Sequence, residues 1–331
     1  MKWESVLAWR MARQHLTAHA TDPLAVVSDL CGLHAQVLSS AQLTLWARMD
    51  DPPDVHELLW RDRTLVKTWA QRGTLHLHRT DELPLWVGAQ AALKPRYETR
   101  SWLKHFKLGE DDVKAIIEGV PAALREGPKS REELATLHPG LARGYGDLLK
   151  PVAFRGELIY AEDGRFTLPE PFEPMDPKAA TKDVARRFLT RYGPATREEL
   201  AKWFGHPSPA QAGKWFPDDV VETEFGLALE EDVAAIEAAA PAGYVRLLPA
   251  FDQYVVAAPR DKRATAHPER IYRPGGWFSP VLLVDGVMAG VWTLEDGVVS
   301  IEPFGKLAKA VREAAEAEAA RLPECKAVNW G

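Results

Sequence analysis

The sequence predicts an α+β fold in which helical segments alternate with short β-hairpins and a small antiparallel sheet follows near the end of the chain. Three observations lead to this prediction. A six-residue pattern occurs twice, at residues 130–135 and 196–201, which lie 66 positions apart. Each copy precedes turn residues and then short runs of β-branched and aromatic residues, which are typical of hairpins. Beyond residue 241, runs rich in Val, Leu and aromatic residues are separated by glycine turns, which favours strands.

Composition limits the class of protein. The 331 residues, 46% of them hydrophobic and 27% charged, are enough for two or three packed units. No stretch approaches the roughly 18 apolar residues of a membrane helix, and the first residues lack the apolar run of a signal peptide, so we expect a cytoplasmic protein without a membrane partner. Cys31 and Cys325 are the only cysteines, which excludes a disulfide framework and a cysteine-based zinc site. We expect neither a metal nor another cofactor.

The charge is unevenly distributed along the chain. With a net charge of −6, any affinity for nucleic acid must come from a locally basic surface. Residues 1–110 hold 14 Lys and Arg against 12 Asp and Glu, whereas residues 111–331 hold 27 against 35. Seven of the ten histidines lie in the first 105 residues. The N-terminal third is therefore favoured as a nucleic-acid contact region.

We divide the chain into four segments, of which residues 1–110 are the first. The apolar spacing predicts a helix over residues 6–16, and Asp22 before Pro23 predicts a second helix that continues to Leu33. The remaining expected elements are helices over 43–49 and 54–60 and a hairpin of 64–69 with 74–78.

The second segment, residues 111–176, begins its central helix at the first copy of the repeat. Ser130 and Glu133 form a capping box, in which the hydroxyl accepts from a first-turn amide and the carboxylate reaches back. Helices followed by a hairpin make a winged helix, and the expected elements here are a turn at 138–140, a recognition helix over 145–154 and a hairpin of 157–160 with 165–168.

The third segment, residues 177–240, repeats this plan after an acidic, proline-rich linker at 169–177. Its expected elements are a capped helix from Thr196, a helix over 209–215 and a hairpin of 220–223 with 226–229. The fourth segment, residues 241–331, is expected to form an antiparallel β element over 244–258, 277–284 and 287–294 and a terminal helix over 305–322. The first segment has the same order of helices and hairpin, so three winged-helix units are predicted.

Two basic runs are candidate DNA contacts. Residues 94–107 interleave five basic side chains with Tyr97, Trp102 and Phe106, the mixture that phosphate contacts and base stacking require. An amphipathic helix with its aromatic residues packed inward explains the same pattern. A second run has a charged surface loop as its alternative and consists of Arg260, Lys262, Arg263, Arg270 and Arg273. We expect double-stranded DNA to contact Lys94, Arg96, Arg100, Lys104, Lys107, Arg72, Arg260 and Arg263.

His34 and Gln36 are the candidate catalytic residues. They lie at the expected end of the second helix, where a helix-to-loop junction would let both side chains face one site. An imidazole accepts a proton from water, and a carboxamide orients water but cannot act as a base. A helix-capping His with a surface Gln explains the same residues without chemistry. His76 and His78 alternate on an expected strand without a carboxylate or Cys at metal-ligand spacing, so we expect a solvated or phosphate-facing strand.

Four segments resemble the AlkZ-like winged-helix DNA glycosylases, bacterial proteins that remove alkylated bases and unhook interstrand crosslinks. They are LHAQ at 33–36, LVKTWAQRGTLHL at 65–77, LLPAFDQY at 247–254 and the stretch 286–292. The resemblance covers almost the whole chain. It implies three tandem winged helices and a C-terminal β element in a C-shaped body whose concave face holds DNA.

The family's catalytic motif is Gln-x-Gln or Gln-x-Asp at the position of His34 and Gln36. Gln36 matches the second Gln, whereas His34 replaces the first, and a neutral imidazole can activate water where a carboxamide cannot. The resemblance implies a monofunctional glycosylase that excises N-alkylated purines, because a positively charged purine leaves without protonation and no lysine nucleophile is required. A non-catalytic winged-helix DNA-binding regulator explains the repeats and basic runs equally well, and a protein-interaction module is a third hypothesis.

Overall fold

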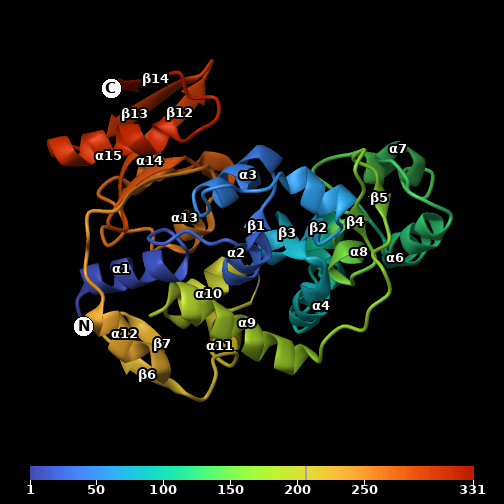
Figure 1. The fold of residues 1–331 in the computed structure, drawn as a ribbon. Helices are drawn as coiled ribbons and strands as arrows, with labels where there is room; N and C mark the ends of the chain where they lie inside the picture. The colour runs from blue at the N-terminus through green and yellow to red at the C-terminus, as the bar shows by residue number, and fades with distance from the viewer. Residues whose placement is uncertain (206) are drawn as a thin grey trace.

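The computed structural model describes residues 1–205 and 207–331 and shows a mixed α+β fold, which confirms the predicted class (Figure 1). In Figure 1 the C-terminal sheet lies at the upper left, the elements of residues 110–168 lie at the right, and a three-stranded sheet lies between them. Within the described ranges, no helix combines the length and apolar character needed to cross a membrane.

The N-terminal segment places His34 on the edge strand of the three-stranded sheet. The strands are antiparallel in the order β1–β3–β2, and His34 lies opposite His76. The predicted hairpin, β2 with β3, is confirmed, whereas the third strand β1 was not predicted. The elements are α1 (Trp3–Arg13), α2 (Pro23–Asp29), β1 (Leu33–His34), α3 (Leu38–Trp46), a π-helical turn (Glu57–Arg61), β2 (Leu65–Trp69), β3 (Leu75–Arg79), α4 (Leu83–Ala91) and α5 (Arg100–Phe106).

The second helix ends at Asp29 and not at Leu33, which corrects the predicted helix-to-loop position of His34. Cys31 and Gly32 have φ angles of +60° and +92°, and residues in this left-handed region terminate helices. A Cβ on residue 32 would lie 2.4 Å from Cε1 of His78, so only glycine fits against this histidine. The chain is then extended when it reaches His34.

The repeated pattern begins a helix in both copies, as predicted. Ser130 caps α7 and Thr196 caps α10 through complete capping boxes. The helix predicted over 145–154 is shorter, because Gly146 has a left-handed backbone and the helix starts only at Lys150. Both hairpins are confirmed, β4 with β5 and β6 with β7. The elements are α6 (Glu110–Arg125), α7 (Arg131–Leu134), α8 (Lys150–Phe154), β4 (Ile159–Tyr160), β5 (Phe166–Thr167), α9 (Pro177–Tyr192), α10 (Arg197–Phe204), α11 (Pro209–Ala212), β6 (Val220–Thr223), β7 (Gly226–Leu229) and α12 (Val233–Ala238).

A five-stranded sheet in the order β14–β13–β12–β11–β8 forms most of the C-terminal segment. Its edge strand β14 pairs in parallel with β13, so the predicted purely antiparallel element is wrong at this edge. Residues 253–257, predicted as strand, form a helix because Asp252 caps it by accepting from the Tyr254 amide. The elements are β8 (Val245–Leu248), α13 (Gln253–Ala257), α14 (Pro268–Ile271), β9 (Tyr272–Arg273), β10 (Trp277–Phe278), β11 (Val281–Val284), β12 (Val287–Glu295), β13 (Val298–Pro303), α15 (Lys309–Ala320) and β14 (Ala327–Trp330).

The hydrophobic cores are shared between segments. One cluster joins Trp86 of α4 to Phe188 of α9 and Trp203 of α10. Another joins Met11 and Trp46 of the N-terminal helices to the C-terminal sheet. Because each segment buries apolar surface against its neighbours, the segments stabilise one another around β1.

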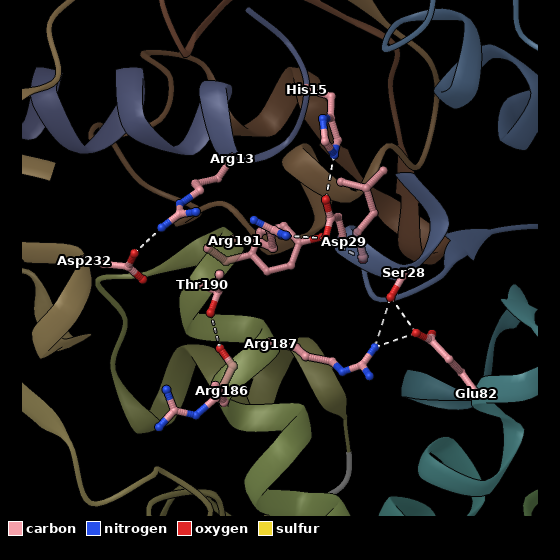
Figure 2. Close-up of polar contacts among 12 residues, drawn as sticks. Arg13, His15, Ser28, Asp29, Glu82, Arg186, Arg187, Thr190, Arg191 and Asp232 are labelled. Atoms are coloured by element: carbon pink, nitrogen blue, oxygen red, sulfur yellow. Dashed lines mark hydrogen bonds and ion pairs between the residues drawn. The ribbon is translucent and has the colours of Figure 1, made fainter. Parts of the chain in front are cut away.

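Charged side chains of α9 hold the N-terminal elements in place (Figure 2). Asp29, the last residue of α2, pairs with Arg191 and lies 2.7 Å from Nε2 of His15. Arg187 contacts Glu82 at 2.7 Å. Burial alone would raise the pKa of Asp29, but the hydrogen bond from His15 and the charge of Arg191 outweigh burial and lower it. Because Asp29 precedes the turn into β1, these contacts position the strand that carries His34.

Candidate active site and DNA-contact residues

His34 is packed against an aromatic ring and a second histidine. The residue is only 6% exposed. The Phe251 ring stacks on the imidazole with centroids 4.4 Å apart and 6° between the planes, and His76 meets it edge-on at 5.4 Å. Nδ1 of His34 is buried and has no protein hydrogen-bond partner in the described part of the chain. The stack on Phe251 and the edge contact with His76 therefore fix the ring.

The hydrogen bonds of His76 define it as a neutral ring. Its Nδ1 lies 3.0 Å from the Thr74 carbonyl oxygen, which can only accept, so Nδ1 carries the proton. Its Nε2 lies 3.2 Å from Nη2 of Arg72, which can only donate, so Nε2 accepts. Arg72 thus holds His76 in a single tautomer.

His78 is fixed in the opposite tautomer. Nε2 of Gln71 donates to the Cys31 carbonyl oxygen at 3.0 Å, so its Oε1 faces His78 and accepts from Nε2 at 3.2 Å. His76 and His78 are both 0% exposed, so the expected solvated strand is wrong. His76 contacts His34, and His78 contacts His76 with ring centroids 5.8 Å apart.

Burial keeps all three rings uncharged at neutral pH. Together with the positive charge of Arg72, it lowers the pKa of His34 to about 3. Burial also lowers the pKa of His78 to about 3 and the pKa of His76 well below its ordinary value. A neutral imidazole has a free acceptor nitrogen, which a proton would otherwise occupy.

Gln36 lies just beyond β1 and is exposed. Between it and His34, the Ala35 amide donates to the Leu75 carbonyl oxygen at 2.8 Å, which continues the pairing of β1 with β3. The structure therefore places His34 below the surface and Gln36 at the surface, at the end of one edge strand.

Comparisons with known proteins agree over almost the full chain. The family model described as DNA glycosylase AlkZ-like matches residues 27–324. The chain is 34% identical to an interstrand DNA cross-link repair glycosylase of Streptomyces sahachiroi, over 99% of this chain and 97% of the relative. The chain belongs to the AlkZ-like DNA glycosylase family. The solved structure of the Streptomyces sahachiroi DNA glycosylase AlkZ matches with a TM-score of 0.90 at 31% identity, covering 100% of this chain and 99% of that one.

Membership of this family makes the chain a DNA glycosylase, a hydrolase that acts on N-glycosyl bonds. The predicted family and enzyme class are thereby confirmed.

The basic residues of 94–107 lie on α5 of the glycosylase and beside its two ends. Trp102, Leu103 and Phe106 are half-buried against a hydrophobic core, as the amphipathic interpretation requires. The side chain of Arg96 lies outside the described part of the structure. The exposed basic residues of this stretch are Lys94, Arg100, Lys104 and Lys107.

Arg72 is half-buried, and its guanidinium has hydrogen-bond partners within the glycosylase. Its Nη1 donates to the Trp203 carbonyl oxygen at 2.6 Å, and its Nη2 donates to His76. Burial lowers its pKa to about 10, so the guanidinium stays charged at neutral pH. Its clearest role in the structure is to orient His76 and to bring positive charge near His34.

Arg260 and Arg263 also have partners within the glycosylase. Arg263 lies 2.9 Å from Asp261 and 3.2 Å from Glu199. Arg260 lies over the Tyr272 ring, 5.0 Å from its centroid. Their charges are therefore less available than those of α5, and their contact with DNA stays a prediction.

Residues 247–254 stand out in the sequence only as a family signature, and their contacts with β1 were not predicted. Phe251 stacks on His34, and Nε2 of Gln253 donates to the Gly32 carbonyl oxygen at 2.9 Å. Gln253 is 1% exposed, and its Oε1 has no protein partner among the described residues. More than 200 positions of sequence separate His34 from Phe251, so no local sequence pattern could have predicted their contact.

A fully buried ion pair anchors this C-terminal stretch. Arg48 and Asp252 are both 0% exposed and form two hydrogen bonds of 2.7 and 2.8 Å. The Arg48 side chain also donates to the Gln14 and Thr44 carbonyl oxygens, which adds hydrogen bonds to its buried charge. Asp252 stands between Phe251 and Gln253, and the pair therefore sets the position of both against β1.

Proposed function

We propose that this glycosylase hydrolyses the N-glycosidic bond of N-alkylated purines in double-stranded DNA and unhooks interstrand crosslinks, with His34 and Gln36 positioning the attacking water. The relative named an interstrand DNA cross-link repair glycosylase supports the choice of crosslinked DNA as substrate. The observation that carries the proposed mechanism is the burial of a neutral His34 whose Nδ1 has no protein partner in the described part of the chain.

A buried nitrogen of this kind is normally satisfied by water. A neutral imidazole accepts a hydrogen bond from that water, and the Gln36 carboxamide at the surface can orient the same molecule. In the proposed reaction the water oxygen bonds to C1′ of the sugar as the C1′–N9 bond breaks. The electron pair of the broken bond neutralises the positive charge of the alkylated purine, and the water, once bonded to C1′, releases its proton to solvent while His34 stays neutral.

The low basicity of His34 suits this substrate class. An alkylated purine already carries positive charge, so its bond to the sugar breaks early and the water needs position more than a strong base. A charged imidazolium at this place would repel the oxocarbenium-like sugar. Since water is the nucleophile, no lysine forms a Schiff base, and the enzyme is monofunctional.

DNA is held, in this proposal, by three winged-helix units at residues 1–110, 111–176 and 177–240, with the β element of 241–331 completing a C-shaped body. The order of helices and hairpin within each unit supports this arrangement. The exposed Lys94, Arg100, Lys104 and Lys107 around α5 supply phosphate contacts, because exposed cations can reach a duplex without breaking interactions in the core.

The test uses a duplex with one N7-methylguanine and a duplex with one interstrand crosslink. We expect the wild-type protein to release the free base and leave an abasic site that alkali cleaves. His34→Ala and Gln36→Ala should reduce release by at least about tenfold, whereas Ser39→Ala, an exposed neighbour on α3, should keep it. DNA binding without base release from any alkylated duplex would favour the regulator hypothesis, and equal release by all four proteins would remove His34 and Gln36 from the mechanism.

A further inference from the structure

Lys202 of α10 and Arg260, which follows α13, are exposed cations without an acidic partner of their own. In the described part of the chain, neither side chain forms a hydrogen bond or an ion pair. Arg260 lies over the rings of Tyr272 and Phe278, 5.0 and 5.1 Å from their centroids. Such ring contacts orient a guanidinium but do not cancel its charge. Both positive charges therefore remain open to an anion from outside.

An ion pair between segments brings these two cations to the same side of α10. Glu199 and Lys202 are three positions apart on this helix, so they share one face. Nη2 of Arg263 lies 3.2 Å from Glu199 and 2.9 Å from Asp261. The loop of residues 260–263 is thereby held against the face of α10 that carries Lys202.

Positive charge is in surplus where the loop meets the helix. Lys202, Arg260 and Arg263 face only the carboxylates of Glu199 and Asp261, and Arg263 already occupies both. Burial lowers the pKa of Lys202, the charge of Arg260 lowers it further, and the opposing effect of the two carboxylates does not restore it. A bound anion would relieve the repulsion between the two cations.

Contacts between aromatic rings place Arg260 near the candidate active site. Its guanidinium lies over Phe278, and the Phe278 ring is 5.7 Å from the ring of Phe251. Phe251 stacks on His34 with centroids 4.4 Å apart. Because each of these steps is short, Arg260 lies within a few nucleotide lengths of His34.

The end of α10 is also close to the candidate active site. The Trp203 carbonyl oxygen, one residue after Lys202, accepts from Nη1 of Arg72 at 2.6 Å. A Cβ on Gly205 would lie 2.7 Å from Cα of Arg72, so the backbones meet closely here. The charge of Arg72 in turn contributes to the low pKa of His34. Lys202 and Arg260 therefore approach the site from two different segments.

We propose that Lys202 and Arg260 bind one backbone phosphate of the damaged strand, beside the nucleotide whose base is removed. The inference rests on the proposed function and names a contact that holds C1′ of this nucleotide near His34. Phosphate contacts fix the register of a protein on DNA. Lys202 and Arg260 are thus positioning residues, because they touch the phosphate and not the bond that breaks.

The test combines Lys202→Ala with duplexes in which an uncharged methylphosphonate replaces one phosphate near an N7-methylguanine, one position at a time. Base release is measured in single turnovers at saturating enzyme, so that weaker binding does not contribute. We expect Lys202→Ala to lower the rate on the unmodified duplex by about tenfold, because a displaced nucleotide reacts slowly even when it is bound. At one position the methylphosphonate should cause the same loss in the wild type and no further loss in Lys202→Ala.

Lys202→Arg keeps the positive charge and should retain most of the rate and the sensitivity to that one methylphosphonate. Lys214→Ala removes another exposed lysine of the same segment and should respond to every methylphosphonate as the wild type does. An unchanged rate in Lys202→Ala, or losses that add at every position, would overturn the phosphate site and leave the proposed function intact. Absence of base release by the wild type from any alkylated duplex would overturn both.

Discussion

Acid should destabilise this protein through its buried histidines, and His34 allows the effect to be isolated. Its pKa is about 3 in the folded protein, whereas an unfolded His titrates at about 6.5. Below about pH 6.5 the unfolded chain binds a proton that the folded protein does not, so the free energy of unfolding decreases as the pH falls. From about pH 8 to about pH 5, His34 alone accounts for a decrease of about 2 kcal/mol.

His34→Gln removes the titrating group and should reduce the decrease of unfolding free energy between these two pH values by about 2 kcal/mol. The measurement is urea unfolding at each pH, followed by tryptophan fluorescence and by far-UV circular dichroism. His56→Gln removes an exposed histidine and should keep the wild-type decrease. If the stability of His34→Gln falls as much as that of the wild type, the His34 ring accepts protons in the folded state and the burial argument is refuted.

Three further predictions concern activity, binding and stability. The rate of single-turnover base excision should not decrease near pH 6.5 because of His34, since burial lowers the pKa of this residue to about 3. We expect wild type and His34→Gln to show the same dependence of rate on pH between about pH 5 and 8. A decrease of the rate at acid pH in the wild type alone would contradict this prediction. Changing Arg100 and Lys104 to Ala should make DNA binding less sensitive to salt. In a plot of log binding constant against log salt concentration, measured by fluorescence anisotropy, the slope should fall by roughly 0.9 for each phosphate that either side chain neutralises. An unchanged slope would place α5 away from DNA. Asp252→Ala leaves the Arg48 charge buried and unpaired, so urea unfolding should show a destabilisation of about 3–5 kcal/mol, and a value under about 1 kcal/mol would contradict the assigned burial.

Local features of the fold were predictable from the sequence. The capping boxes at Ser130 and Thr196 depend on residues three positions apart, and both begin helices as expected. The hairpin of residues 64–69 with 74–78 was also predicted, because a turn and β-branched residues determine it locally. The caps and the turn form in the folded protein because the tertiary packing around them is compatible with these local structures.

The site itself depends on contacts that the sequence pattern does not encode. The strand β1 is only two residues long, and it forms because Cys31 and Gly32 turn the chain and β3 offers a free edge. His78 is buried against Trp86 of α4, with ring centroids 4.5 Å apart, and His76 is buried against Arg72 and His34. Alternating histidines suggest a solvated strand, but a strand buried on both faces shows no alternation of polar and apolar residues by which to recognise it.

The C-terminal segment contributes Phe251 to the candidate active site. Phe251 has a φ angle of +62°, a left-handed conformation that costs about 1–3 kcal/mol in a residue other than glycine. The surrounding structure maintains it, because Asp252 is fixed by Arg48 and Gln253 is fixed by the Gly32 carbonyl. In this conformation the Phe251 ring stacks flat on His34. The proposed water-binding imidazole is therefore packed against a residue of the C-terminal segment, so the repeated segments alone would not assemble this site.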